Sequence, residues 1–317
     1  MHLLIALDGA DPKLARKYFK RMEKIGKIKN MKTYLNTGPS FGSALTGLPP
    51  KKHKLEVFGI DSNLTTIKGD LIWDKIGSSI GIANVPILWP PIKIRGWMIC
   101  GMLSPSEKVY TYPAKLTEEL NKIGYEIWIK EYPKGKSGFS NILNYLFKSY
   151  LFFVLNHPHE ALKRLNKKNI KVVVDTMKGK QTSAATPLID NVWWDNEWKR
   201  VIKNRTKGFT YLLNNYPVDI AILCYKALDC IQHRLFHKPK KIEEWYEIQE
   251  KEIEKLLNGL KKKPKTITIF SDHGFKGAKR GYITGDHKSP GLLISNVKNN
   301  INKIEDIYNF ILNLENK

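Results

Sequence analysis

Six aspartate and histidine residues lie directly after, or in the loop beside, apolar runs that are expected to form buried strands. The runs are 2–7, 219–225, 266–271 and 291–295, and the six residues are Asp8, Asp229, His233, Asp272, His273 and His287. Carboxylate oxygens and imidazole nitrogens are the ligands that zinc favours in proteins. The residue types and their placement therefore predict a site for divalent metal ions.

Taken singly, these residues have simpler explanations. An aspartate before glycine after a strand, as in Asp8-Gly9, is typical of a turn. Asp229 and His233 have the spacing of a pair on a helix surface, and His287 in GDHKSPG suits a solvated loop. In an open parallel sheet, however, ligands bind beyond the carboxyl ends of the strands, where all six residues would meet. A shared metal site is therefore favoured over six coincidences.

A second chemical feature is the small, hydroxyl-rich segment 36–53, NTGPSFGSALTGLPPKKH. Its glycines and prolines fit a long loop, or a loop that caps a helix through Thr37 or Ser40. The alternative is a nucleophile at a helix N-terminus, where backbone N–H groups attract a phosphate oxygen. A threonine hydroxyl becomes an effective nucleophile when a divalent metal lowers its pKa.

The elements that must position these residues follow from alternating apolar and amphipathic stretches. Strands are expected at 2–7, 79–85, 97–100, 219–225, 266–271 and 291–295, and helices at 13–25, 114–122, 196–214, 242–260 and 303–314. Continuous apolar strands separated by helices are typical of a mostly parallel sheet that is covered on both faces. The expected fold is an α/β three-layer sandwich with a parallel-dominated central sheet.

Residues 104–195 interrupt this rhythm and are expected to form a cap inserted into a catalytic core of residues 1–103 and 196–317. Within the insertion, the apolar stretch 142–155 runs into the basic stretch 163–168. The apolar stretch is shorter than the ~20 residues that a membrane-spanning helix needs. We expect either a cap helix with a solvated basic end or a substrate gate that offers an apolar wall and cations together.

Composition and charge indicate the class of partner. The chain has 53 Lys and Arg against 30 Asp and Glu, a formal net charge of +23, which favours phosphoesters, nucleic acid or acidic lipid. Three cysteines without a CxxC pair argue against a disulfide scaffold and favour a reducing, cytoplasmic compartment. The apolar N-terminus lacks the basic start and cleavage site of a signal peptide.

The ordered set of motifs resembles the alkaline phosphatase superfamily, in particular its type I phosphodiesterase/nucleotide pyrophosphatase family. The segments that carry the resemblance are LIALDGAD at 4–11, Thr37-Gly38-Pro39, the TG-x-x-P-x-x-H pattern that ends at His53, VPILWPP at 85–91, LDCIQH at 228–233, SDHGF at 271–275 and GDH at 285–287. The resemblance covers most of the chain outside 104–195. It implies an alkaline-phosphatase-like fold.

The resemblance also implies a division of the site residues between two metal ions. One ion would be bound by Asp8, Thr37, Asp272 and His273, and the other by Asp229, His233 and His287. Thr37 would attack phosphorus and carry the phosphoryl group until water releases it. Three imidazoles among oxygen ligands favour zinc, with manganese as the alternative. The expected activity is hydrolysis of a small anionic phosphodiester.

Two departures from the family bear on the specific activity. Lys54 follows His53 where the family usually has glycine, and no asparagine stands near Phe58, where nucleotide-cleaving members have one. Nucleotide pyrophosphatase activity is therefore less favoured than general phosphodiester hydrolysis. The backbone N–H of Gly38 is expected to help stabilise the phosphoryl oxygen.

Two other functions remain open. A phosphomutase of the same superfamily normally carries a large second domain, and this chain is short for one. A non-catalytic module would bind nucleic acid or acidic membrane through its basic runs, with Trp193, Trp194 and Trp198 stacking on bases. A preference for diesters over monoesters is expected, because the metal motifs have no arginine beside them other than Arg234 and Arg280.

Overall fold

The computed structural model describes residues 1–56, 63–101, 108–126, 191–280 and 283–315. The strands are β1 (His2–Leu7), β2 (Lys29–Met31), β3 (Ile80–Ala83), β4 (Gly96–Ile99), β5 (Thr111–Tyr112), β6 (Ile220–Tyr225), β7 (Thr266–Phe270), β8 (Gly274–Arg280), β9 (Ile283–Lys288) and β10 (Gly291–Ser295). The helices are α1 (Pro12–Tyr18), α2 (Thr37–Thr46), α3 (Pro50–His53), α4 (Ile72–Lys75), α5 (Leu116–Lys122), α9 (Asn191–Asn215), α10 (Ala227–Leu235), α11 (Pro239–Gly259) and α12 (Asp306–Leu314), with a 3₁₀ turn η1 (Met22–Lys24).

The centre of the molecule is an eight-stranded sheet of order β2-β10-β7-β1-β6-β3-β4-β5, beside a separate β8-β9 hairpin. The strands from β7 to β4 in this order are parallel to one another. At one edge β10 is antiparallel to β7 and β2 is antiparallel to β10, and at the other edge β5 is antiparallel to β4. The predicted α/β sandwich with a parallel-dominated sheet is thus confirmed.

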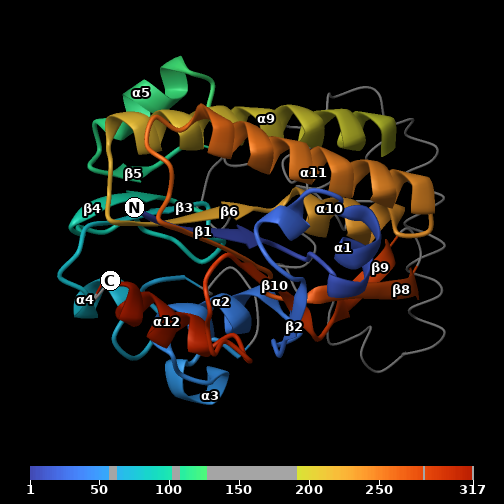
Figure 1. Ribbon diagram of the computed structural model, residues 1–317, viewed down its shortest axis with the longest axis horizontal. Coiled ribbons are helices and arrows are strands. Elements are labelled where there is room, and N and C mark those ends of the chain that lie inside the picture. The colour runs from blue at the N-terminus through green and yellow to red at the C-terminus, as the bar shows by residue number, and fades with distance from the viewer. Residues whose placement is uncertain (57–62, 102–107, 127–190, 281–282, 316–317) are drawn as a thin grey trace, which may run out of the picture.

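The central strand β1 shows why the predicted strands are apolar along their whole length. Leu3, Ile5 and Leu7 belong to the core under α9, α10 and α11, whereas Leu4 and Ala6 belong to the core under α2, α4 and α12. A strand covered by helices on both faces has no polar side. The two helical layers lie on either side of the sheet in Figure 1.

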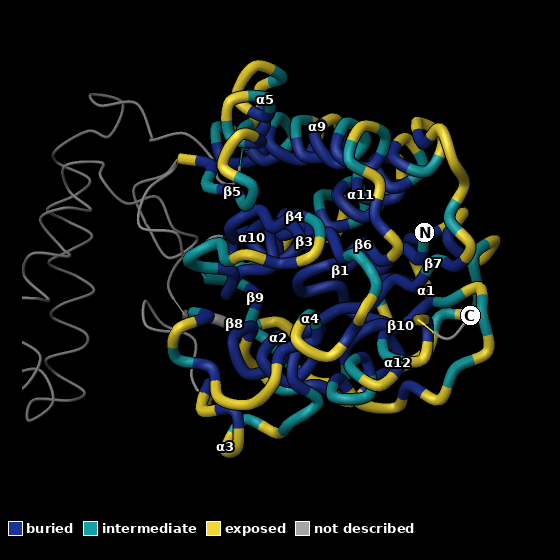
Figure 2. Tube along the Cα trace, turned by 90° about the vertical axis from the view of Figure 1, so that its left-hand side faces the viewer, coloured by how far each residue is buried: buried dark blue, intermediate teal, exposed yellow. Residues whose placement is uncertain are grey.

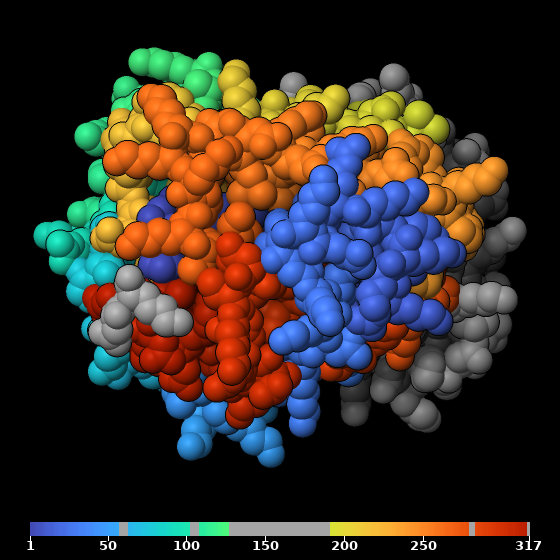
Figure 3. Space-filling model, viewed as in Figure 1, coloured from blue at the N-terminus to red at the C-terminus, as the bar shows by residue number. Residues whose placement is uncertain are grey.

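The burial pattern and the outer surface follow from this layering. Buried residues fill the middle of the trace in Figure 2, and exposed residues gather on the outer loops and helix turns. In Figure 3 the N-terminal (blue) and C-terminal (red) segments lie side by side, because β2 pairs with β10. No helix among the described residues is long and apolar enough to cross a membrane.

The helix predicted over 13–25 is wrong in its second half. Helix α1 ends at Tyr18, and the short turn η1 follows. The carboxylate of Glu250 in α11 accepts hydrogen bonds from the backbone N–H groups of Arg21 and Met22, at 2.6 and 3.0 Å. This contact between distant segments replaces helical hydrogen bonds, and local periodicity carries no sign of it.

Only part of the predicted cap lies within the described residues. In segment 108–126, β5 pairs with β4 and extends the central sheet. Residues 191–195 are the first turn of α9. The apolar stretch 142–155 and the basic stretch 163–168 lie outside the described residues, so the division into core and cap stays a prediction.

Candidate functional site

All seven residues predicted for the site lie at one end of the central sheet. Their places are Asp8 after β1, Asp272 and His273 after β7, Asp229 and His233 in the helix α10 that follows β6, Thr37 at the start of α2, and His287 in β9. β7, β1 and β6 are adjacent and parallel, so their carboxyl ends meet at the same edge.

His287 lies in strand β9 and not in a loop, so that detail of the prediction is wrong. It pairs with Phe275 across the β8-β9 hairpin. Gly285, which was expected in a loop, lies where strand β9 packs closely against helix α10. A Cβ atom at Gly285 would lie 2.4 Å from the backbone oxygen of Gln232 in α10. The glycine therefore lets the hairpin bring His287 up to the helix that carries Asp229.

Asp8, Asp272 and His273, together with Thr37, form what we call the inner group. The Nε2 atom of His273 lies 3.4 Å from Oδ1 of Asp8 and 3.4 Å from Oδ2 of Asp272. It lies 3.4 Å from Oγ1 of Thr37 as well. Ligand atoms ~2.0–2.1 Å from a tetrahedral zinc ion are about 3.3 Å apart. The spacing of the inner group therefore fits such an ion.

Two carboxylate oxygens of the inner group accept no hydrogen bond from the described part of the chain. They are Oδ1 of Asp8 and Oδ2 of Asp272, and both residues are fully buried. The other oxygen of Asp272 accepts a hydrogen bond from the backbone N–H of Gly9 at 3.1 Å. A buried carboxylate oxygen without a partner is energetically unfavourable, and a cation beside both oxygens removes the penalty.

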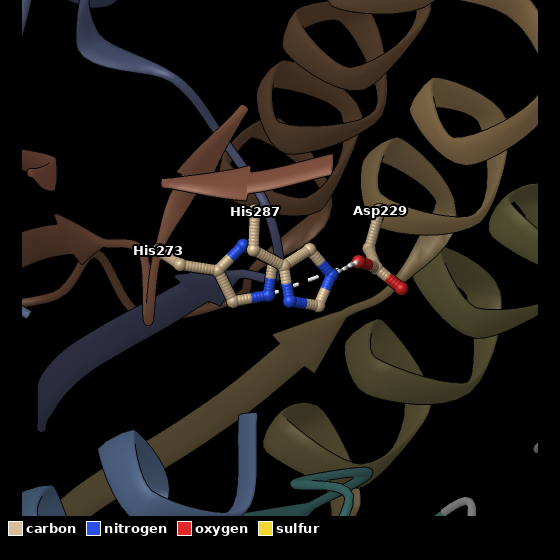
Figure 4. A group of neighbouring side chains, drawn as sticks. All are labelled: Asp229, His273 and His287. Carbon is tan, nitrogen blue, oxygen red and sulfur yellow. Dashed lines mark hydrogen bonds and ion pairs between the residues drawn. The ribbon is translucent and has the colours of Figure 1, made fainter. Parts of the chain in front are cut away.

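Asp229, His233 and His287 form the outer group. Oδ1 of Asp229 lies 3.3 Å from Nε2 of His233 and 3.1 Å from Nε2 of His287. The two Nε2 atoms are 2.9 Å apart. The groups adjoin, because Nε2 of His273 lies 3.7 Å from the same Asp229 oxygen. Figure 4 shows the rings of His273 and His287 side by side and both directed at Asp229.

Backbone carbonyls orient all three imidazoles of the site. The Nδ1 atoms of His233, His273 and His287 contact the carbonyl oxygens of Gly285, Gly274 and Leu35 at 3.1, 3.2 and 2.8 Å. Because a carbonyl oxygen only accepts, each Nδ1 donates this hydrogen bond, and each Nε2 is the ring atom that faces the other site residues. Metal-binding histidines are oriented in the same way. The Nε2 atoms of His233 and His287, 2.9 Å apart and both beside Oδ1 of Asp229, are spaced as ligands of one cation would be.

Lys226 lies buried between the two groups and is not among the residues predicted from the sequence. Its ammonium donates hydrogen bonds to Oδ2 of Asp8 at 2.7 Å and to Oδ2 of Asp229 at 2.9 Å. Burial alone would lower the pKa of Lys226, but the carboxylates of Asp229 and Asp8 hold it well above its usual value. Its spacing of three residues before Asp229 was the available signal.

The surroundings divide the negative charge unequally among the carboxylates. Burial would raise the pKa of Asp229, but Lys226 and His233 hold it well below its ordinary range. Burial and the Asp8 carboxylate raise the pKa of Asp272 well above its ordinary value. Burial would lower the pKa of His233, and the Asp229 carboxylate raises it. Negative charge is thus favoured at Asp229 and disfavoured at Asp272.

Phe275, the last residue of the SDHGF motif, packs against the imidazoles and had no predicted role of its own. The centre of its buried ring lies 5.0, 5.6 and 5.2 Å from the ring centres of His233, His273 and His287. Gly9 leaves room for this ring, since a Cβ atom at Gly9 would lie 2.8 Å from it. Gly9 also has φ +76°, a conformation that favours glycine.

Thr37 is the first residue of helix α2, so the start of segment 36–53 is helical and not a loop. The side chain of Asn36 makes no capping hydrogen bond, and the N–H groups of Thr37 and Gly38 have no acceptor within the helix. Pro39 has no N–H in this first turn, where one would be unsatisfied in any case. Thr37 therefore presents a hydroxyl beside N–H groups that suit an anionic oxygen.

His53, at the end of the TG motif, packs against Gly42 of α2 and hydrogen-bonds to Ser43 of the same helix. Its Nδ1 accepts a hydrogen bond from the N–H of Leu55 at 3.1 Å, so Nε2 carries the proton and donates to Oγ of Ser43 at 3.0 Å. Lys54 has φ +69°, which explains why glycine suits this position. The position near Phe58 lies outside the described residues.

The described residues weaken the expectation of base stacking. Trp194 and Trp198 are fully buried in the core, so that expectation is wrong for both of them. Trp193 is half-buried. The guanidinium Nε of Arg234 donates a hydrogen bond to Oδ1 of Asn191, the first residue of α9, at 3.0 Å. The side chain of Arg280 is outside the described part of the chain.

No protein-family model matches the sequence, and no curated protein matches it. Solved structures of similar fold include phosphonoacetate hydrolase from Sinorhizobium meliloti 1021 in complex with phosphonoacetate, at 14% identity and a TM-score of 0.43. That similarity covers 88% of this chain and 57%, little more than half, of the hydrolase. An inactive murine ectonucleotide pyrophosphatase/phosphodiesterase 5 in complex with AMP has 10% identity, a TM-score of 0.49 and coverage of 99% and 94%.

A TAB5 alkaline phosphatase mutant with bound Mg is also similar in fold, with 12% identity, a TM-score of 0.44 and coverage of 99% of this chain and 97% of that one. All three proteins belong to the alkaline phosphatase superfamily, which the sequence motifs resemble. At these identities and TM-scores the similarity concerns the fold and says nothing about the activity of this chain.

Proposed function

We propose that the chain is a metal-dependent phosphodiester hydrolase with a divalent ion at the inner group and another at the outer group. The observation that carries the proposal is the convergence of three Nε2 atoms on carboxylate oxygens, of which Oδ1 of Asp8 and Oδ2 of Asp272 lack hydrogen bonds within the described residues. Nitrogen and oxygen ligands at tetrahedral spacing favour zinc, with manganese as the alternative.

Thr37 is the nucleophile in this proposal. Its hydroxyl, held 3.4 Å from Nε2 of His273, attacks phosphorus in line with the leaving oxygen, whose bond to phosphorus breaks. The phosphoryl group is then carried on Thr37 until a water molecule attacks and releases it. The N–H of Gly38 binds a phosphoryl oxygen at the start of α2. Bound divalent ions supply the Lewis acidity that makes the hydroxyl reactive and stabilises the leaving oxygen.

The charges around the site favour a diester over a monoester. A monoester carries a second negative charge, and enzymes that cleave one place extra cations around it. Lys226 is buried and already bonded to two carboxylates, and Arg234 is bonded to Asn191. Both cations are therefore already bonded to other side chains. The net charge of +23 attracts anionic substrates in general and does not distinguish the two classes.

Assays of the protein with a bis-aryl phosphodiester and the matching aryl phosphomonoester test the proposal. The protein is first stripped with a chelator and then loaded with zinc or with manganese. We expect turnover only in the loaded protein and faster turnover of the diester. Full activity of the stripped protein would contradict the metal site, and faster turnover of the monoester would contradict the substrate class.

A further inference from the structure

Lys226 has no part in the proposed hydrolysis, yet it lies at the border between the two groups. Its side chain is 5% exposed, and its partners Asp8 and Asp229 are 0% and 6% exposed. A lysine this deeply buried is rare unless paired, and here it is paired twice. The ammonium connects a carboxylate of the inner group to the one carboxylate of the outer group.

The oxygens of these two carboxylates are divided between Lys226 and the imidazoles. Oδ2 of Asp8 and Oδ2 of Asp229 accept the hydrogen bonds from Nζ of Lys226. Oδ1 of each carboxylate lies on the other side, 3.4 Å from His273 for Asp8 and 3.1 Å from His287 for Asp229. Lys226 and a metal ion therefore use different oxygens, and both can be present together.

The charge balance of the metal-free site gives Lys226 its role. Three buried carboxylates, those of Asp8, Asp229 and Asp272, come within reach of one another, and Lys226 supplies a positive charge among them. Buried charges that lose their partner are strongly destabilising. Once metal ions are bound, the same carboxylates have other positive partners, so they depend less on Lys226.

We propose that Lys226 is a resident cation that holds the inner and outer groups together while metal is absent. The inference rests on the proposed metal site and adds a residue that the hydrolysis does not require. It predicts that loss of Lys226 harms the metal-free protein more than the metal-loaded protein. By mass action, the stabilisation that metal provides is then larger in the variant than in the parent.

The test compares melting temperatures of the parent and Lys226→Met in excess chelator and in saturating zinc. We expect Lys226→Met to melt about 10 °C below the parent in chelator, and less than half as far below it in zinc. Lys199→Met is the matched control, because Lys199 pairs with the buried Asp195 at 2.9 Å and neither residue belongs to the site. The melting temperature of Lys199→Met should fall below that of the parent by the same amount in chelator and in zinc.

Each outcome separates this inference from the proposed function. If zinc does not stabilise the parent, both the metal site and the inference are overturned. If zinc stabilises the parent but Lys226→Met loses equally in both conditions, only the inference is overturned. If Lys226→Met folds only with zinc, the double variant with Asp8→Asn removes one excess charge. The double variant should fold in chelator, and its failure to do so would overturn the inference.

Discussion

The inner and outer groups of the site differ in burial and in charge. Asp8, Asp272 and His273 of the inner group are fully buried, whereas the side chains of His233 and His287 in the outer group are 20% and 18% exposed. The inner group has two carboxylates and one imidazole, and the outer group has the reverse. Two buried carboxylates repel each other until a cation binds, so the inner group gains more from an ion than the outer group does.

The largest expected effect is a loss of turnover when the hydroxyl of Thr37, in the inner group, is removed. Thr37→Ala should lower kcat at least about a thousandfold, whereas Thr37→Ser should keep much of it because the hydroxyl survives. Ser40→Ala is the control, since Oγ of the buried Ser40 accepts from the N–H of Tyr34 at 3.2 Å. Steady-state kinetics of the three variants measure these effects. If Ser40→Ala were inactive and Thr37→Ala active, the nucleophile would be Ser40 and not Thr37.

The next effect is on metal content, which distinguishes the groups directly. The parent should hold two equivalents of metal, and Asp272→Ala and His287→Ala should each hold one. A chelator titration of the parent should remove the ion of the exposed outer group first. Elemental analysis of each sample measures both quantities. Loss of both ions in either variant would show that the two groups do not bind independently.

A matched pair of neutral substitutions sharpens the charge difference in the metal-free protein. Asp272→Asn should raise the free energy of unfolding, because burial and Asp8 raise the pKa of Asp272 and disfavour its charge. Asp229→Asn should lower it, because Lys226 and His233 stabilise that charge. Denaturant titrations in chelator measure the free energy of unfolding of both variants. If the two variants changed it in the same direction, the negative charge would not be divided unequally between Asp272 and Asp229.

The smallest effect concerns His53, a buried imidazole outside both groups. Burial lowers the pKa of His53, so the unfolded chain takes up a proton that the folded protein resists. Stability should therefore fall as the pH drops below about 6.5, the ordinary value. Gln at this position keeps a donor for Ser43 and does not titrate.

Melting temperatures at pH 7 and pH 5 in chelator should fall by a few degrees less for His53→Gln than for the parent. Every other titratable group is present in both proteins, so the difference isolates His53. Equal falls would show that His53 is not held neutral in the fold.

The inner group was accessible to sequence reasoning because its signals are local. Asp8 follows β1 directly, and Asp272 and His273 follow β7 after one residue, so an apolar strand followed by a carboxylate is visible in a short window. The strand-end rule then brings them together without knowledge of side-chain contacts. The start of α2 at Thr37 also follows from local features, since Gly-Pro is compatible with a first helical turn.

The remaining features depend on contacts between distant segments. The strand that carries His287 exists because a glycine lets the β8-β9 hairpin pack closely on α10, and the same glycine suggested a loop in the sequence. Glu250, more than 220 residues away in the sequence, accepts hydrogen bonds from the backbone that follows α1 and so helps to end that helix. The role of Lys226 depends on Asp8, which is 218 residues away in the sequence and lies 2.7 Å from the ammonium in the fold. A local sequence pattern does not show this contact.

The most direct test of the two-group site is anomalous diffraction at the zinc edge from crystals of zinc-loaded protein. We predict one peak ~2.0–2.1 Å from Nε2 of His273 and a second at the same distance from the Nε2 atoms of His233 and His287. Peaks elsewhere, or none at either group in protein that has been given zinc, would contradict the account.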